Sequence, residues 1–86
     1  MKKAGDLWYV YILRCADDSL YTGITRDIRR RVEEHNSGEK TAAAYTRSRR
    51  PVDLVYQETC DTRSAATKRE YTIKQLSRQQ KEALIK

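Results

Sequence analysis

Five side chains in this sequence have types that suit chemistry on a phosphate. They are two phenols, a guanidinium, an imidazole and a carboxylate, namely Tyr11, Tyr21, Arg31, His35 and Glu70. A guanidinium neutralises charge that grows on phosphoryl oxygens, a base deprotonates water, and a carboxylate oxygen holds Mg²⁺ or Mn²⁺. A phenol has an ordinary pKa of about 10, so a tyrosine serves as the base only if Arg31 and a metal ion lower that pKa. If the five side chains converge, they meet the needs of phosphodiester hydrolysis.

The two tyrosines lie in neighbouring apolar runs. Tyr11 is in the middle of the first run, and Tyr21 lies across a turn from it, close to Gly23. Gly23 removes side-chain bulk, so we expect another backbone to approach closely there. The chain has six tyrosines and no phenylalanine, and each buried phenol needs a partner for its hydroxyl. The alternative for any single tyrosine is an amphipathic residue that only fills the core.

Arg31 and His35 are four residues apart, which places them on one face of the helix predicted after the second apolar run. Ile28 comes three residues before Arg31, so this face borders the apolar side of the helix. Two alternatives remain open. In the first, the Arg31 side chain only extends along the surface to reach water. In the second, His35 only interacts with the C-terminus of its helix.

Glu70 lies among apolar positions of a later helix. It is four residues after Ala66 and three before Ile73, so the apolar stripe contains a carboxylate. Burying an unpaired carboxylate is costly, so Glu70 should pair with a cation or bind a metal ion. The alternative is an ordinary ion pair with Lys74, one turn further along the helix.

Changes of apolar periodicity divide the chain into elements. Runs at residues 7–15 and 20–24, joined by a polar turn at 16–19, predict an antiparallel hairpin. A helix follows, with Thr25 as its expected N-cap and Gly38 as its left-handed end.

The second half of the chain also divides into segments with the patterns of a loop, a strand and helices. Residues 39–50 are expected to form a polar, basic loop, and residues 52–56 a strand. A helix starts near residue 62 or 64 and runs to about 76, and a capping box between Ser77 and Gln80 begins a last short helix. The order strand, strand, helix, strand, helix, helix predicts an α+β fold, with a small three-stranded sheet covered by helices in one domain over residues 1–86.

Composition narrows the class of protein. The 86 residues carry 18 Lys and Arg against 12 Asp and Glu, which gives a formal net charge of +6. Such a surface attracts phosphate polymers and excludes an acidic binding module. The apolar run at 7–13 is far shorter than the roughly 20 residues of a membrane-spanning helix. With no export signal, and with Cys15 and Cys60 too few for a disulfide framework or a zinc site, we expect a cytoplasmic protein with reduced cysteines.

Basic side chains with an aromatic residue among them suit contact with a nucleic acid. Arginines beside one tyrosine in the segment from Lys40 to Arg50 can grip backbone phosphates and stack on an exposed base. We identify no element that reads the major groove, so we expect structure-selective or weakly selective cleavage that depends strongly on salt. The candidate substrate-binding residues are Arg30, Tyr45, Arg47, Arg49, Arg50 and Lys74.

The same residues carry a family resemblance. Residues 9–35 resemble the N-terminal half of a GIY-YIG nuclease domain, and the whole chain is similar to its small stand-alone bacterial members, the YhbQ-like proteins. Tyr9-Val10-Tyr11 stands at the first motif, of which only the tyrosine is kept, and Tyr21-Thr22-Gly23 stands at the second, with Thr for Ile. Arg31 follows Tyr21 by ten residues, His35 follows by one more turn, and Glu70 stands at the place of the family's downstream glutamate.

The resemblance implies a three-stranded antiparallel sheet flanked by helices and a metal-dependent endonuclease. Glu70 would bind a single Mg²⁺ or Mn²⁺ ion, and Arg31 would hold the scissile phosphate. Tyr11 and Tyr21 would supply the base and a second hydroxyl, with Tyr11 favoured as the base because His35 could polarise it. The family often has an asparagine late in the site; none follows Asn36 here, so that role is missing or falls to Lys74 or Gln75.

Three functions are compatible with these features. The first is a metal-dependent endonuclease in DNA repair or recombination, with DNA favoured over RNA and with no obligate protein partner. The second is a nucleic-acid-binding module with the same fold and weak or no catalysis. The third, least favoured, is a protein-interaction domain whose charge serves only solubility.

Overall fold

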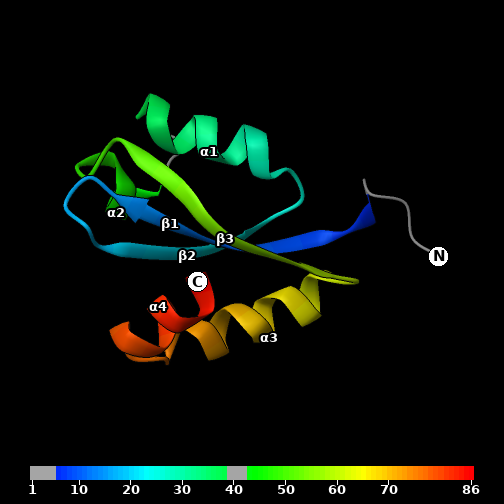
Figure 1. The fold of residues 1–86 in the computed structure, drawn as a ribbon. Coiled ribbons are helices and arrows are strands. Elements are labelled where there is room, and N and C mark those ends of the chain that lie inside the picture. Colours follow the sequence, from blue (N-terminus) through cyan, green and yellow to red (C-terminus); the bar gives the residue numbers. More distant parts are fainter. Residues whose placement is uncertain (1–5, 39–42) are drawn as a thin grey trace.

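The structure, a computed structural model, describes residues 6–38 and 43–86, and in these residues a three-stranded sheet lies between helices (Figure 1). One helix covers one face of the sheet, and the two C-terminal helices cover the other. The order of elements is the predicted one apart from an additional short helix. The elements are β1 (Trp8–Cys15), β2 (Leu20–Thr25), α1 (Ile28–Ser37), α2 (Ala44–Arg47), β3 (Val52–Cys60), α3 (Arg63–Lys74) and α4 (Arg78–Ile85).

The central strand is β1, and both of its neighbours run antiparallel to it, in the order β2-β1-β3. The register places Tyr11 opposite Gly23 on β2 and opposite Gln57 on β3. The hairpin turn forms as predicted, because the Asp17 carboxylate accepts a hydrogen bond from the Ser19 backbone N–H at 3.1 Å. The α+β class and the antiparallel three-stranded sheet are therefore confirmed.

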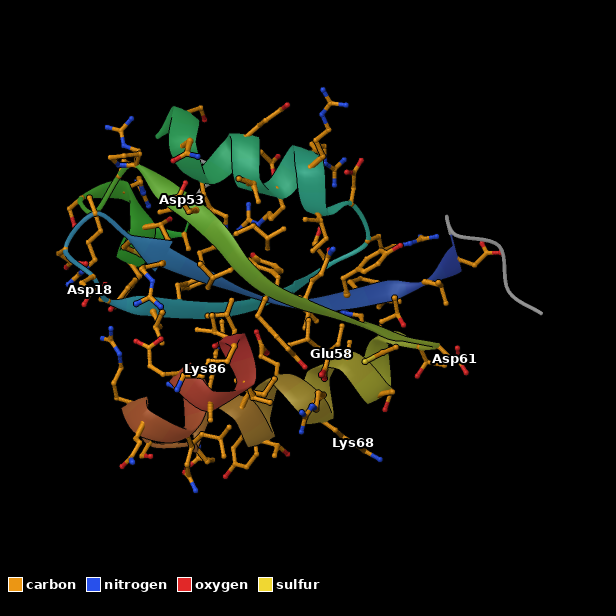
Figure 2. All side chains as sticks on the ribbon, in the orientation of Figure 1. Asp18, Asp53, Glu58, Asp61, Lys68 and Lys86 are labelled. Carbon is orange, nitrogen blue, oxygen red and sulfur yellow. The ribbon has the colours of Figure 1, made fainter. Side chains whose placement is uncertain are left out.

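Alternation along β1 sends its side chains into two different environments. Val10 and Ile12 pack with Ala66 and Ile73 beneath α3 and α4, in a cluster that excludes water. Charged side chains frame this face: Figure 2 shows Glu58 between β3 and α3, where it accepts a hydrogen bond from Arg69 Nε at 2.5 Å.

The opposite face of the sheet lies beneath α1. Tyr11, Leu13 and Cys15 of β1 are buried there with Val52 of β3. Ile28 and Val32 of α1, which the helical spacing predicted to point inward, pack on this group, together with Tyr21. The phenols predicted from the sequence therefore belong to the α1 face of the sheet.

Three of the helix ends agree with their sequence signals, and one prediction is wrong. Gly38 ends α1 with φ 72°, and the Thr62 side chain caps α3. The Ser77 capping box with Gln80 begins α4. Thr25, however, is the last residue of β2, and Asp27 is the N-cap of α1, accepting from the Arg30 backbone N–H at 3.1 Å.

The middle of the chain differs most from the prediction. Residues 39–50 were expected to form a loop, but α2 occupies Ala44–Arg47. Lys40 lies outside the described residues. The strand predicted at 52–56 continues to Cys60, because it pairs with β1 along its whole length. Pairing with a neighbouring strand extends β3 through Gln57, Glu58 and Thr59, whose own β propensity is mixed.

The described parts of the chain contain no helix that is long and apolar enough to cross a bilayer. Cys15 and Cys60 are both free thiols. Cys15 pairs with Val52 and Cys60 pairs with Trp8, at opposite ends of the β1–β3 ladder. This register places them too far apart for a disulfide.

Candidate active site

The ring of Tyr11 lies across the backbone of Gly23 on the edge strand β2. A Cβ atom at position 23 would lie 2.5 Å from the Tyr11 hydroxyl oxygen and 2.7 Å from its Cζ atom. The expectation that another backbone approaches Gly23 is therefore wrong, because a side chain fills the space instead. Gly23 lets a fully buried phenol extend from the central strand to the edge of the sheet.

His35 connects this phenol to α2. Its Nε2 atom lies 3.0 Å from the Tyr11 hydroxyl oxygen, and its Nδ1 atom lies 2.7 Å from the hydroxyl oxygen of Thr46. His35 and Thr46 have no solvent-accessible surface. The alternative in which His35 interacts with the C-terminus of its helix does not describe this arrangement, because both ring nitrogens contact side chains from other elements.

Burial sets the protonation states of both groups. It lowers the pKa of His35 from 6.5 to about 4, with a further lowering by the positive charge of Arg31. Burial also raises the pKa of Tyr11 to about 12. Arg31 acts on the Tyr11 pKa in the expected direction, lowering it through a hydrogen bond, but the effect of burial is larger. At neutral pH the structure therefore holds a neutral imidazole beside a protonated phenol.

Arg31 reaches the same group from the preceding turn of α1. Burial by itself lowers the pKa of Arg31, but hydrogen bonds with Glu34 and Tyr11 outweigh it and raise that pKa. The Arg31–Glu34 distance is 3.1 Å, and both side chains are mostly buried. The alternative of a surface arginine that only reaches for water is thus wrong for Arg31.

Tyr21 joins the group through its ring. The ring centroid of Tyr21 is 6.4 Å from that of Tyr11 and 5.3 Å from that of His35. The ring centroid of Tyr21 is also 5.8 Å from that of Tyr45. Residues from β1, β2 and α1 are therefore brought together as the sequence predicted, and α2 contributes a residue to the same group of rings.

Glu70 approaches from the helix that packs against β2 and β1. Burial is the main reason why the pKa of Tyr11 is raised, and the negative charge of Glu70 makes a small contribution in the same direction. The Glu70 carboxylate lies 3.5 Å from Lys74 Nζ, and 21% of the Glu70 side chain is exposed. The alternative from the sequence, an ion pair with Lys74, is therefore present. Gln75, the other substitute for the family's asparagine, ends α3 and is exposed.

A metal ion at Glu70 would have few protein ligands. Within residues 6–38 and 43–86, no group of three or more His, Cys, Asp or Glu side chains could hold an ion. Mg²⁺ commonly keeps several waters and binds one or two carboxylates together with substrate phosphates. A single carboxylate that is partly exposed fits that mode of binding, with the substrate as the second source of oxygen ligands.

Four of the six residues predicted to bind substrate lie in or next to α2, namely Tyr45, Arg47, Arg49 and Arg50. The Arg49 guanidinium lies 4.0 Å above the Tyr45 ring and forms an ion pair with Asp17 at 3.0 Å. Arg47 and Arg50 line a surface hollow of about 580 Å³. Arg30 lies apart from them, exposed on α1.

Two members of the group were not predicted as site residues. Thr46 carried no signal, because a threonine in a basic segment is usually exposed. Glu34 is three residues after Arg31, so the spacing for an ion pair was present in the sequence. Asn36 has a structural role instead: its side-chain amide bonds the Val52 backbone in both directions, at 3.1 Å and 2.7 Å, and fixes α1 to β3.

Known proteins are similar to this chain in sequence and in fold. The model of the GIY-YIG catalytic domain matches residues 7–83. A UPF0213 protein of Desulfotalea psychrophila is 65% identical over 79 residues, covering 92% of this chain and 71% of that protein. A UPF0213 protein of Staphylococcus saprophyticus is 56% identical over 80 residues, covering 93% of this chain and 95% of that protein.

Two solution NMR structures resemble the chain. The UPF0213 protein BH0048 of Bacillus halodurans is 46% identical, with a TM-score of 0.58 over 92% of this chain and 82% of that one. The protein EF2693 of E. faecalis is 45% identical, with a TM-score of 0.60 over 95% of this chain and 82% of that one. Since the domain model covers most of the sequence and the relatives share its fold, the chain belongs to the GIY-YIG nuclease family, whose domain implies a nucleic-acid substrate.

Proposed function

We propose that this protein is a metal-dependent endonuclease that hydrolyses phosphodiester bonds of DNA. The observation that supports this most is the 3.0 Å contact between the Tyr11 hydroxyl and a neutral, buried His35, with Arg31 beside it. A phenol alone is a weak base at neutral pH. A phenol that passes its own proton to an imidazole while it takes one from water makes the imidazole the final acceptor of that proton.

Arg31 favours the proton transfer when an anionic substrate is present. In the protein alone, burial and then the positive charge of Arg31 lower the pKa of His35. A scissile phosphate held by Arg31 would offset that charge, so His35 would accept a proton more readily. Arg31 would thereby have two roles. It would stabilise the charge on the phosphate, and its contact with that phosphate would raise the pKa of His35.

Glu70 would hold the Mg²⁺ or Mn²⁺ ion, together with waters and phosphate oxygens. Such an ion, when bound, supplies positive charge that stabilises the attacked phosphate and the departing oxygen. Lys74 has to give up its ion pair with Glu70 for this, and its ammonium group then becomes available to a neighbouring backbone phosphate. Tyr21, in ring contact with both Tyr11 and His35, would supply the second hydroxyl on the phosphate side.

The surface around α2 is where we expect the rest of the nucleic acid to bind. Arg47 and Arg50 border the hollow beside α2, and Arg49 with Tyr45 offers a charged aromatic edge. These groups contact phosphates and bases without reading sequence, so we propose structure-selective or weakly selective cleavage in DNA repair or recombination. DNA rather than RNA as the substrate and a cytoplasmic location are parts of the same proposal.

One observation favours a second function, a nucleic-acid-binding module with little or no turnover. The only carboxylate assigned to the metal ion is already neutralised by Lys74 at 3.5 Å. If that ion pair persists when DNA binds, the protein would hold DNA without cleaving it.

Glu70→Gln and Arg31→Ala distinguish the two functions. Cleavage of duplex, single-stranded, flap and junction DNA is measured with Mg²⁺ or Mn²⁺, and binding of the same substrates is measured in parallel. We expect Arg31→Ala to lower the cleavage rate about 10²–10³-fold, the usual effect of removing a group that stabilises transition-state charge. We expect Glu70→Gln to bind DNA without cutting it.

The matched controls are Glu33→Gln and Arg29→Ala on the solvent side of α1, where the two side chains are 71% and 92% exposed. Both controls should cleave as the wild type does. Wild-type protein that binds without cleaving would establish the binding module instead. Equal cleavage by the wild type and Glu70→Gln would show that Glu70 holds no catalytic ion.

A further inference from the structure

The contact between His35 and Thr46 decides what His35 can do for Tyr11. The hydroxyl oxygen of Thr46 is 2.7 Å from Nδ1, and the hydroxyl oxygen of Tyr11 is 3.0 Å from Nε2. A neutral imidazole carries one proton, on one of these two nitrogens. With the proton on Nε2, His35 would donate to Tyr11; with the proton on Nδ1, His35 would accept from Tyr11.

The surrounding donors and acceptors favour the proton on Nδ1. The Thr46 hydroxyl lies 3.0 Å from the Ala43 carbonyl oxygen, to which it donates, so its lone pairs face His35. The Tyr11 oxygen accepts from Arg31, and within the described residues its proton has one acceptor, Nε2 of His35. The other tautomer would leave the proton of a fully buried phenol without an acceptor, which is unfavourable.

We propose that Thr46 is a positioning residue that holds His35 in the Nδ1–H tautomer and so leaves Nε2 to accept the Tyr11 proton. Thr46 does not touch the phenol. It acts through the imidazole, as a carboxylate or carbonyl does for other histidines whose second nitrogen has a chemical task.

The fold holds Thr46 in place through the segment that contains α2. The Arg49 backbone carbonyl accepts from the Ala16 N–H at 2.9 Å, and the Arg49 side chain pairs with Asp17 at 3.0 Å, so the hairpin turn anchors the end of this segment. The Arg50 guanidinium donates to the Asn36 carbonyl at 3.3 Å, which connects the segment to α1. These contacts with the hairpin turn and with α1 hold the segment, and Thr46 within it, in place beside His35.

Groups from four elements face His35. They are Tyr11 of β1, Tyr21 of β2, Arg31 and Glu34 of α1, and Thr46 of α2. Burial is the main reason why the pKa of His35 falls to about 4, so the imidazole is neutral at pH 7, and its hydrogen-bond partners select the tautomer. The tautomer itself is a property of the folded chain, whereas its effect on cleavage rests on the proposed endonuclease function.

The first experiment is ¹⁵N NMR of the full chain at pH 7. His35 is the only histidine, so the two ring-nitrogen signals are assigned without ambiguity. In the wild type we expect Nδ1 to be protonated and Nε2 to show the far-downfield shift of an unprotonated nitrogen. Thr46→Val keeps the shape of the side chain without its hydroxyl and should move the Nε2 signal toward the protonated value. Thr46→Ser should keep the wild-type signals.

The second experiment measures cleavage by the same proteins. Thr46→Val should lower kcat about 10- to 100-fold, as for other groups that orient a histidine from behind, with little change in KM. Thr46→Ser, which keeps a hydroxyl group, should retain most of the wild-type kcat. Thr72→Val is the matched control, because the Thr72 hydroxyl also donates to a helix carbonyl, that of Lys68, but on an exposed part of α3.

The outcomes separate this proposal from the proposed function. A wild-type spectrum with the proton on Nε2 overturns the proposal even if Thr46→Val does not fold. The same tautomer in Thr46→Val and the wild type also overturns it, as does a tautomer change that leaves kcat unaltered in an active enzyme. If the wild type cleaves nothing, the endonuclease fails, and the NMR result still decides whether Thr46 positions His35.

Discussion

The two faces of the sheet use burial in different ways. Beneath α3 and α4, Val10 and Ile12 pack against Ala66 and Ile73 through aliphatic contacts. Beneath α1, buried polar atoms lie among apolar ones, and no buried side-chain nitrogen or oxygen in the described residues lacks a hydrogen-bond partner. On the first face, the burial of apolar side chains stabilises the fold directly. On the second face, burial is tolerated because each polar group is paired, and it shifts the pKa of Tyr11 and His35 far from their ordinary values.

Removing a large side chain from the aliphatic face should have the largest effect on stability. Ile73→Ala leaves a cavity between α3 and the sheet, and we expect the free energy of unfolding to fall by about 2–5 kcal/mol. Urea unfolding measures the loss, and Leu54→Ala, at an exposed apolar position on β3, is the control with a much smaller loss. Because Ile73 packs the helix that carries Glu70, a fall in cleavage per folded molecule would show that packing on this face also positions the proposed metal ligand.

On the polar face, the packing of Tyr11 on Gly23 predicts a smaller and conditional loss. Gly23→Ala places a methyl group against the phenol, so we expect the free energy of unfolding to fall by about 1–3 kcal/mol. In a Tyr11→Ala background the same substitution should be neutral or slightly stabilising, because glycine is itself unfavourable inside a strand. A double-mutant cycle from urea unfolding measures this coupling. Equal losses in both backgrounds would show that another neighbour restricts position 23.

The protonation of His35 predicts an effect that appears only on acidification, a dependence of stability on pH. Its pKa is 6.5 before folding and about 4 in the folded protein, so between these values the unfolded chain binds more protons. Stability should therefore be highest above about pH 6.5 and should decrease as the pH falls toward 4. His35→Gln removes the chain's only histidine, so its stability should vary less over this range.

Urea unfolding of the two proteins at several pH values between 4 and 7 provides the comparison. Carboxylates such as Glu82, whose pKa is lowered to about 2 by hydrogen bonds from Arg14 and Arg78, are present in both proteins and cancel in the difference. Parallel pH profiles would mean that His35 takes up a proton as easily in the folded state as in the unfolded one.

Much of the fold could be predicted because its signals are local. The turn at Asp17, the left-handed end at Gly38 and the capping box at Ser77 each depend on a few consecutive residues. The N-cap of α1 was misplaced from Asp27 to Thr25 because both residue types can cap, and the pairing of Thr25 with Tyr9 in the sheet decided between them.

The side chains of the site could be named from their types and spacing, but their contacts and protonation states could not. The sequence by itself determined which phenols, which arginine and histidine pair and which carboxylate were available, because one helical turn or one strand register brings such residues to a common face. Only the tertiary structure decided that Tyr11 fills the space over Gly23 and that Thr46 bonds His35. It also decided that burial outweighs Arg31 in setting the pKa of Tyr11. Burial and long-range contacts arise from packing between elements, and no short window of sequence contains that information.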